Sequence, residues 1–182
     1  MTKDLRLDRE PSGPGPRVLL VGMMGAGKTT VGQAVSALTG WRYLDNDELV
    51  EWATGHPTPE LLADADETTL RRVEAAALDV ALSVDPPVVA GVAAGVVVDP
   101  QARRRMREGS FVVYLRAPVS VLVERVGSGE GRPWLDGDPL TAMTRLSAGR
   151  EELYVEVADL VLDVDQLTPE ETAARIVGAA TD

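Results

Sequence analysis

Short apolar runs alternate along the chain with longer stretches in which apolar residues recur every three or four positions. Short, mainly apolar runs are typical of buried strands, and they occupy residues 17–21, 41–44, 88–90, 111–115 and 160–162. Apolar residues at helical spacing predict helices over residues 28–39, 67–82, 103–109, 119–126, 140–155 and 169–180. Residues 45–55 are expected to form a loop that enters a further helix.

Two of the expected helices carry boundary signals. Gly40 follows the first helix and is a suitable stop, because glycine readily adopts the left-handed conformation at a helix C-terminus. Thr168, Pro169 and Glu171 match a capping box with proline at the first helical position. The last helix is therefore expected to begin at residue 169.

Strands and helices alternate throughout, which predicts an α/β fold with a mostly parallel sheet and helices on both faces. The chain has 182 residues and contains no internal repeat, so we expect one domain over residues 17–182. Residues 1–16 are polar and end in PSGPGP, a composition that predicts a disordered N-terminal tail.

A glycine-rich segment links the first strand to the first helix. Residues 22–29, GMMGAGKT, match the phosphate-loop pattern GxxxxGK[ST], in which backbone N–H groups bind phosphate oxygens at a helix N-terminus. Lys28 is expected to reach the outer phosphates and the Thr29 hydroxyl to ligate Mg²⁺. The residues expected to bind the nucleotide are Gly25, Ala26, Gly27, Lys28, Thr29 and Thr30. Nucleotide binding alone leaves a kinase, a hydrolysing switch and an ATP-driven machine as alternatives.

Lysine usage supports this interpretation of the loop. Of the 18 basic residues, only Lys3 and Lys28 are lysines. The chain uses arginine almost everywhere else, yet it has lysine in the loop, where a compact ammonium is not interchangeable with a planar guanidinium.

Composition and charge exclude several other functions. The chain has no cysteine and only one histidine, His56, which removes thiolate and histidine-rich metal sites. The net charge of −11 disfavours nucleic acid and anionic membranes as partners, and the arginine run at 103–107 is expected to form a solvated helix face. No apolar run approaches 18 residues and no signal peptide is evident, so we expect a cytoplasmic protein that is a monomer.

Several polar residues are candidates for the acceptor side of a transfer reaction. Asp45 and Asp47 follow the second strand, where one carboxylate could support Mg²⁺ and the other could accept a proton from a hydroxyl; both residues are equally suited to capping a helix. Arg71, Arg132 and Arg150 would each be a solvated surface residue unless the fold brings them together.

The sequence resembles the shikimate kinase family of small P-loop kinases over residues 17–180. The similar segments, in the order of the family, are GMMGAGKTTVG at 22–32, DND at 45–47, LRRVE at 70–74, LVER at 122–125, RP at 132–133, REELY at 150–154 and EVAD at 156–159. The resemblance implies a three-layer P-loop kinase fold with a lid at about residues 127–140, and ATP and Mg²⁺ as cofactors.

The resemblance also implies roles for individual residues on the nucleotide side. Lys28 and Thr29 would serve ATP and Mg²⁺, and Asp45 would support the metal. Arg125 would pack on the adenine.

On the acceptor side, Asp47 would orient the acceptor hydroxyl and could take its proton. Arg71 and Arg150 would bind the acceptor carboxylate, a task that suits fork-shaped guanidinium groups. Arg132 would move in with the lid and stabilise charge on the transferring phosphoryl group.

One segment departs from the family pattern. Where the family has three consecutive glycines that form part of the acceptor pocket, this chain has Ala93, Ala94 and Gly95. Three interpretations stay open: a tolerated variant, a different acceptor, or an ATP-binding regulatory protein without transfer. The leading prediction is transfer of the γ-phosphoryl group of ATP to a hydroxyl of shikimate or a related carboxylated cyclitol.

Overall fold

A twisted sheet with five parallel strands and one antiparallel edge strand forms the centre of the molecule. The computed structural model describes residues 5–6, 16–62, 66–127 and 138–181. In this part of the chain the sheet order is β1-β6-β5-β2-β4-β3. The strands are β1 Leu5–Arg6, β2 Arg17–Val21, β3 Arg42–Leu44, β4 Val88–Gly91, β5 Phe111–Arg116 and β6 Leu160–Asp163.

The middle of the sheet forms the core of the fold. Leu20 of β2 lies beside Gly91 of β4 and Val113 of β5, and every residue of β4 is buried. Strands covered on both faces have no solvent side, which explains why these runs are continuously apolar rather than alternating.

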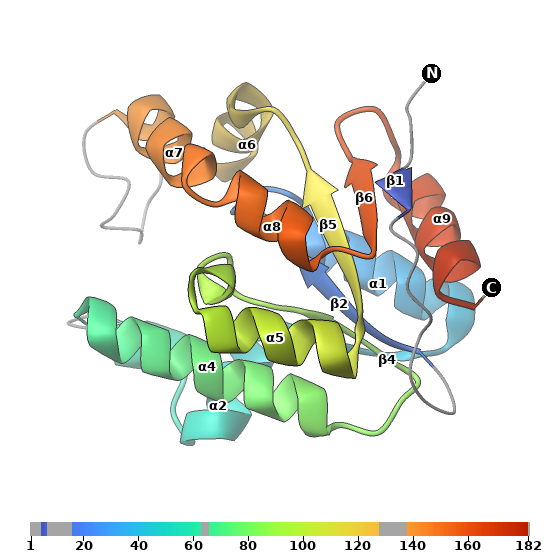
Figure 1. Cartoon of the computed structure of the whole chain (residues 1–182), viewed down its shortest axis with the longest axis horizontal. Coiled ribbons are helices and arrows are strands. Elements are labelled where there is room, and N and C mark those ends of the chain that lie inside the picture. Colours follow the sequence, from blue (N-terminus) through green and yellow to red (C-terminus); the bar gives the residue numbers. More distant parts are fainter. Residues whose placement is uncertain (1–4, 7–15, 63–65, 128–137, 182) are drawn as a thin grey trace.

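Helices cover both faces of the sheet and connect the parallel strands. They are α1 Lys28–Thr39, α2 Asn46–Thr54, α3 Thr58–Leu62, α4 Glu67–Ser83, α5 Pro100–Gly109, α6 Val119–Val126, α7 Pro139–Ala148, α8 Glu151–Val157 and α9 Pro169–Thr181, with a 3₁₀ turn, η1, at Val96–Val98. Helices α1 and α9 pack together on one face, while α5 and α8 contact β5 on the other (Figure 1). This arrangement confirms the predicted three-layer α/β fold.

The order of the strands in the sheet reverses at β2, although strands β2 to β6 all run parallel. From β2 it passes through α1 to β3 on one side of the sheet, and β5 lies on the other side of β2. The carboxyl ends of β2, β3 and β4 therefore meet at one edge, beside the point where the strand order reverses. Ligands of open α/β sheets bind in the crevice at such a point.

The structure changes several of the sequence-based predictions: α3 and η1 were not predicted, and α5 begins at Pro100 rather than at residue 103. The predicted single helix over residues 140–155 is wrong: it is divided into α7 and α8, because the chain turns at Gly149 and Arg150, where the Arg150 N–H donates to the Ser147 carbonyl at 3.0 Å. Within the segment predicted as a tail, Leu5–Arg6 pair antiparallel with β6. The rest of residues 1–15 lies outside the described residues.

The boundary signals are reproduced in the structure. Gly40 has φ of 75° and donates its N–H to the Ser36 carbonyl, which ends α1. At the start of α9 the Thr168 N–H donates to the Glu171 carboxylate at 2.9 Å, and the Glu171 N–H donates to the Thr168 hydroxyl at 3.1 Å. Within the described ranges, every helix is too short or too polar to cross a lipid bilayer.

Helix α4 begins at an aspartate cap whose effect should depend on pH. The Asp66 carboxylate accepts the Thr69 N–H at 2.7 Å, and hydrogen bonds from Thr69 lower the pKa of this carboxyl. Because the pKa is depressed in the folded state, the stabilisation is present above the unfolded pKa of about 3.9 and is lost as the pH falls through the folded value.

We expect Asp66→Ala to lower the urea midpoint of unfolding at pH 7 and to lose this effect in acid. Asp66→Asn is the matched control, since asparagine also caps helices but does not titrate. Urea unfolding of the three proteins between pH 7 and about pH 2.5 checks this, because the range extends below the unfolded pKa of about 3.9. A deficit in Asp66→Ala that stays constant across that range would contradict the expectation.

Candidate active site

The phosphate loop lies at the carboxyl end of β2 and leads into α1. Gly27 is the N-cap of α1, with φ of 89°, a left-handed conformation that side-chain-bearing residues rarely adopt. No side chain caps this helix, so the first N–H groups of α1 are available to an anion. The residues predicted to bind phosphate, including Gly25, Ala26 and Thr30, are thus arranged as a phosphate loop.

The Lys28 ammonium lies inside this loop. It donates to the Gly22 carbonyl at 2.8 Å and to the Met23 carbonyl at 3.1 Å. An ammonium held by two carbonyls of the same loop is already located where phosphate oxygens would approach. The position fits the role predicted for Lys28.

Asp45, the residue after β3, accepts a hydrogen bond from the phosphate loop. Its Oδ2 accepts the Thr29 hydroxyl at 2.8 Å and the Tyr43 hydroxyl at 2.7 Å, and its Oδ1 accepts the Asp47 N–H at 3.2 Å. Burial alone would raise the pKa of Asp45, but the hydrogen bonds from Tyr43, Thr29 and Asp47 outweigh it, and the pKa is lowered. Asp45 is therefore an anion at neutral pH that caps α2 and contacts the predicted metal ligand.

The oxygen pair of Thr29 and Asp45 fits a magnesium ion. Mg²⁺ prefers hard oxygen ligands and usually binds through one or two protein groups together with substrate phosphates and water. Both oxygens lie next to the phosphate loop, and one of them is ionised.

Asp47 lies in the first turn of α2, two residues beyond Asp45. Its side chain is exposed, and its carboxylate has no hydrogen bond or ion pair within the described residues. An unpaired carboxylate at the edge of the crevice is able to accept a hydrogen bond from an incoming hydroxyl.

Arg71 of α4 is the first of the two arginines, Arg71 and Arg150, that are predicted to bind the acceptor carboxylate and form the carboxylate clamp. Its Nη1 lies 2.6 Å from Oε2 of Glu74, which is almost fully buried, and its Nη2 lies 3.5 Å from Oε1 of the exposed Glu67. Gly95 packs directly against this pair: a Cβ there would overlap Arg71 Nη1 and come within 2.5 to 2.8 Å of both Glu74 oxygens. A Cβ at this position would therefore displace the Arg71 guanidinium, and space rather than a special backbone angle accounts for the glycine, since its φ is −85°.

Arg150 forms the second half, at the break between α7 and α8. Burial raises the pKa of the Tyr154 phenol, while the charge of Arg150 and a hydrogen bond with it act in the opposite direction; the charge of Glu74 raises the pKa further. The Tyr154 hydroxyl donates to the Ala94 carbonyl, one residue before Gly95, which packs against Arg71 and Glu74. The loop at residues 93–95 therefore lies between α4, which carries Arg71, and α8, whose N-cap is Arg150.

The two alanines that replace family glycines are accommodated without backbone strain. Among the described residues, only glycines have a positive φ, so Ala93 and Ala94 both have conformations open to any residue. The Ala94 carbonyl accepts the Tyr154 hydroxyl at 2.6 Å. This geometry is compatible with the tolerated variant, because the backbone of the segment can carry either alanine or glycine.

Arg125, predicted to pack on adenine, lies in the last turn of α6. Its guanidinium donates to the Gly25 carbonyl of the phosphate loop and to the Val164 carbonyl after β6, both at 3.4 Å. The exposed Arg125 therefore bridges two segments that border the predicted nucleotide site. Arg132 and most of the predicted lid lie outside the described residues.

Three residues near the site were given no role by the sequence analysis. The Tyr43 hydroxyl donates a hydrogen bond to Asp45, and the Tyr154 hydroxyl donates one to the Ala94 carbonyl. Glu74 forms an ion pair with Arg71. A signal existed for Tyr43, because residues two apart on a strand point to the same face. Glu74 also had a signal, because it lies three residues after Arg71 on the same helix. Tyr154 had none, because it bonds to a carbonyl 60 positions away in the chain.

These features together define a P-loop phosphotransferase: a phosphate loop with its lysine, an oxygen pair suited to a metal, and a cationic acceptor side. Comparison with known proteins agrees with this class of protein.

Residues 24–181 match the family model described as shikimate kinase. The chain is 38% identical over 164 residues to a shikimate kinase of Halorhodospira halophila, covering 90% of this chain and 92% of the relative. It is 36% identical over 164 residues to a shikimate kinase of Streptomyces avermitilis, and the match covers 90% of this chain and 95% of that relative.

Solved structures point to the same family. A shikimate kinase from Acinetobacter baumannii in complex with shikimate has a TM-score of 0.82 and 31% identity, covering 90% of this chain and 92% of that one. The chain belongs to the shikimate kinase family, as its motifs predicted, and is a phosphotransferase with an alcohol group as acceptor. Membership of a kinase family implies a nucleoside triphosphate donor and a divalent metal.

Proposed function

We propose that the chain transfers the γ-phosphoryl group of ATP to a hydroxyl of shikimate. The observation that carries this proposal is that the loop at residues 93–95 lies between the two elements that carry the arginines. Gly95 packs against Arg71 and Glu74 of α4, and the Ala94 carbonyl accepts the Tyr154 hydroxyl of α8, the helix whose N-cap is Arg150. Guanidinium groups bind carboxylates through paired hydrogen bonds, so two of them favour an acceptor that carries a carboxylate. The relatives named shikimate kinase, one of them solved with shikimate, support this acceptor.

The nucleotide side would be organised around the phosphate loop. Backbone N–H groups of residues 25–30 and the Lys28 ammonium would bind the phosphates, and Arg125 would pack on the adenine. Thr29 and Asp45 would hold Mg²⁺, which when bound neutralises charge on the phosphate oxygens. Asp45, kept ionised by its hydrogen bonds, would also hold the Thr29 hydroxyl in place before the metal arrives.

On the acceptor side, Asp47 would orient the hydroxyl and accept its proton. Arg71, Arg150 and the backbone at Gly95 would fix the carboxylate end of the acceptor. Arg132, within a lid at about residues 127–140, would approach the transferring group, and closure would exclude water that competes as nucleophile. We also propose that the protein is cytoplasmic and monomeric and that it does not bind nucleic acid, as the net charge of −11 suggests.

The test is ADP release with ATP and Mg²⁺ across a panel of acceptors: shikimate, other carboxylated cyclitols, sugar acids and nucleosides. We expect release to depend on shikimate, and a shikimate analogue without its carboxylate to have a KM raised more than about 100-fold, because two charge-assisted contacts are lost. Release that depends on another acceptor would replace shikimate in the proposal. No acceptor-dependent release across the panel would favour an ATP-binding protein without transfer.

A further inference from the structure

The acceptor loop, residues 93–95, continues directly into η1. The Val96 N–H donates to the Ala93 carbonyl at 3.2 Å, and the Val98 N–H donates to the Gly95 carbonyl at 3.0 Å. Because these bonds close two consecutive turns, residues 93–98 form one compact unit. A displacement of η1 would therefore move Gly95, which packs against Arg71 and Glu74.

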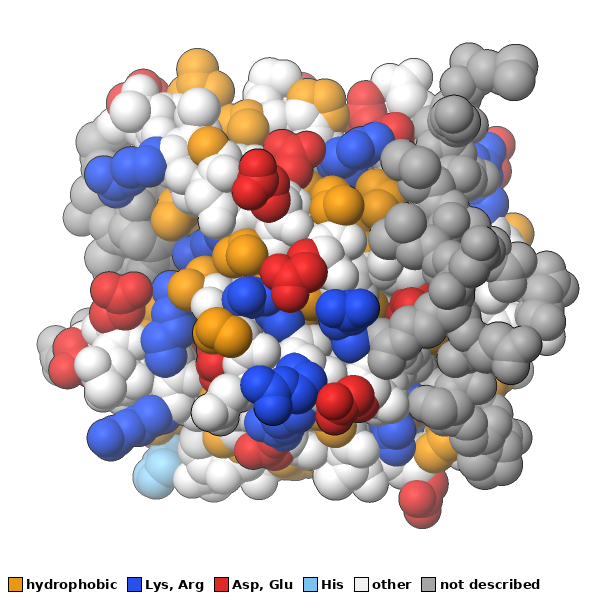
Figure 2. Space-filling model, viewed as in Figure 1, with side chains coloured by type: hydrophobic (Ala, Val, Ile, Leu, Met, Phe, Trp, Pro, Cys, Tyr) orange, Lys and Arg blue, Asp and Glu red, His pale blue; other side chains and the backbone are white. Residues whose placement is uncertain are grey.

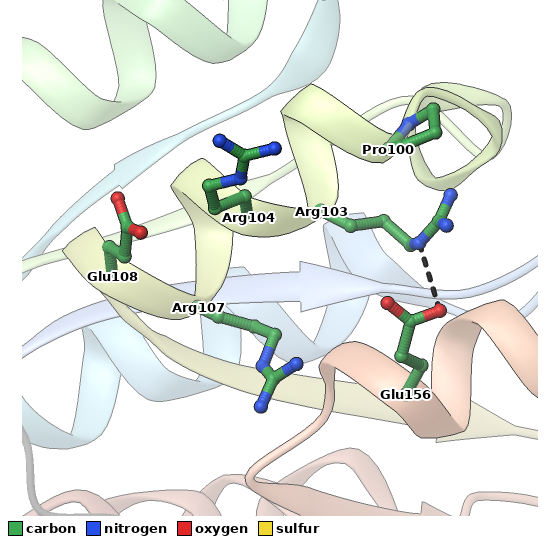
Figure 3. Close-up of a pocket in the computed structure, with 6 residues that line it drawn as sticks. All are labelled: Pro100, Arg103, Arg104, Arg107, Glu108 and Glu156. Carbon is green, nitrogen blue, oxygen red and sulfur yellow. Dashed lines mark ion pairs between the residues drawn. The ribbon is translucent and has the colours of Figure 1, made fainter.

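Arg103 of α5 holds the far end of this unit. Its Nη1 donates to the Val97 carbonyl at 2.8 Å and to the Val98 carbonyl at 3.2 Å, and its Nε lies 3.0 Å from Oε2 of Glu156 on α8. Figure 3 shows this side chain reaching from α5 to Glu156. The Arg103 side chain is only 15% exposed. The expectation that residues 103–107 form a solvated face is therefore wrong for Arg103.

Helix α8 consequently contacts the unit at both ends. Near its middle, Tyr154 donates to the Ala94 carbonyl at 2.6 Å, and two residues later Glu156 pairs with the arginine that binds η1. Arg150 is the N-cap residue of this same helix. The position of α8 therefore affects both sides of the clamp: Arg150 at its start, and Gly95 through the unit that it holds.

We propose that Arg103 and Glu156 are a positioning pair that sets the acceptor loop relative to α8, and thereby the spacing between the Arg71 and Arg150 sides of the acceptor site. This inference rests on the proposed function for its kinetic consequence. Neither residue needs to touch substrate, since both act through the backbone of residues 97–98. Arginine suits the task because its planar fork offers donors in several directions, whereas a lysine ammonium acts as a point charge.

The same surface supplies a matched control. Arg103 lines a cleft of about 390 Å³ together with Pro100, Arg104, Arg107, Glu108 and Glu156. Basic side chains lie close together over α5 on the face seen in Figure 2. Arg104 and Arg107 are exposed, and neither has an ion pair or hydrogen bond within the described residues. Arg104→Gln removes the same charge from the same helix and cleft without breaking the contact to η1.

Steady-state kinetics with shikimate and ATP test the pair. We expect Arg103→Gln to raise the KM for shikimate about tenfold, with kcat and the KM for ATP changed less than about twofold, because misplaced binding groups weaken acceptor binding. Arg103→Lys should recover part of the loss, and Arg104→Gln should behave as wild type. Adding Glu156→Gln to Arg103→Gln should cost little more, since both changes break one interaction. If Arg103→Gln lowers only the concentration of folded, active enzyme and leaves the KM for shikimate unchanged, the inference is overturned.

Amide hydrogen exchange gives a readout that does not depend on the acceptor. Exchange of residues 94–98 should accelerate about tenfold in Arg103→Gln and remain unchanged in Arg104→Gln, because only the first releases η1. Unchanged exchange in Arg103→Gln overturns the inference even if wild type phosphorylates shikimate. A wild type inactive on shikimate contradicts the proposed function instead, and the exchange comparison still decides the role of Arg103.

Discussion

Lys28→Ala is expected to lower kcat for acceptor phosphorylation by about 10³-fold, because an ammonium preorganised beside the phosphates stabilises charge that develops during transfer. The structure supports the role of this ammonium, since the Gly22 and Met23 carbonyls already hold it inside the loop. Lys28→Arg should restore little activity, because a planar guanidinium does not fit the space of a compact ammonium. Coupled measurement of ADP release at saturating ATP and acceptor gives kcat.

The chain provides a matched control for this prediction. Lys3 is the only other lysine, and it precedes the strands that carry the site. Lys3→Ala should leave kcat and both KM values within about twofold of wild type, because Lys3 lies outside every motif assigned to the site. A thermal melt of Lys28→Ala close to that of wild type would attribute the loss to chemistry rather than to unfolding. Retention of a tenth or more of wild-type kcat would contradict the role assigned to Lys28.

Gly95→Ala is expected to raise the KM for the acceptor about 30- to 100-fold while changing the KM for ATP less than about threefold. The added Cβ would overlap Arg71 Nη1 and crowd the Glu74 carboxylate, so the guanidinium has to leave its position. Losing one charge-assisted contact to a carboxylate costs about 2–2.7 kcal/mol, which corresponds to this range of affinity. Steady-state kinetics with each substrate varied in turn separates the two KM values.

Ala94→Gly is the control for Gly95→Ala, because it removes a methyl one residue away from the crowded position. Ala94 has no positive φ, and its carbonyl rather than its side chain makes the contact with Tyr154. We therefore expect Ala94→Gly to change the KM for the acceptor less than about threefold. A large gain in acceptor affinity for Ala94→Gly would mean that the alanines narrow the pocket. An unchanged KM for Gly95→Ala would show that Arg71 does not bind the acceptor.

Much of the fold followed from local patterns. The phosphate loop occupies eight consecutive residues and works through its own backbone, so GMMGAGKT between a strand and a helix was enough to place it. Buried strands are continuously apolar whichever neighbours they acquire, and caps such as Thr168 use only residues three apart. The alternation of these elements then implied a parallel sheet with helices on both faces.

Other parts could not be predicted from such patterns. The helix expected over residues 140–155 has apolar residues at regular spacing on both sides of its break, so periodicity concealed the turn that places Arg150. Residues 103–107 are arginine-rich, and composition does not distinguish the largely covered Arg103 from the exposed Arg104 on the same helix. The difference depends on which face of α5 meets η1 and α8.

The sequence by itself determined the class of site, because the phosphate loop and the strands that hold it are encoded by neighbouring residues. Only the tertiary structure decided how the acceptor side is built. Gly95 lies against Arg71, and Tyr154 bonds to Ala94, although the members of each pair are far apart in the chain. Such contacts arise when helices pack on a sheet, and no local spacing of residues records them.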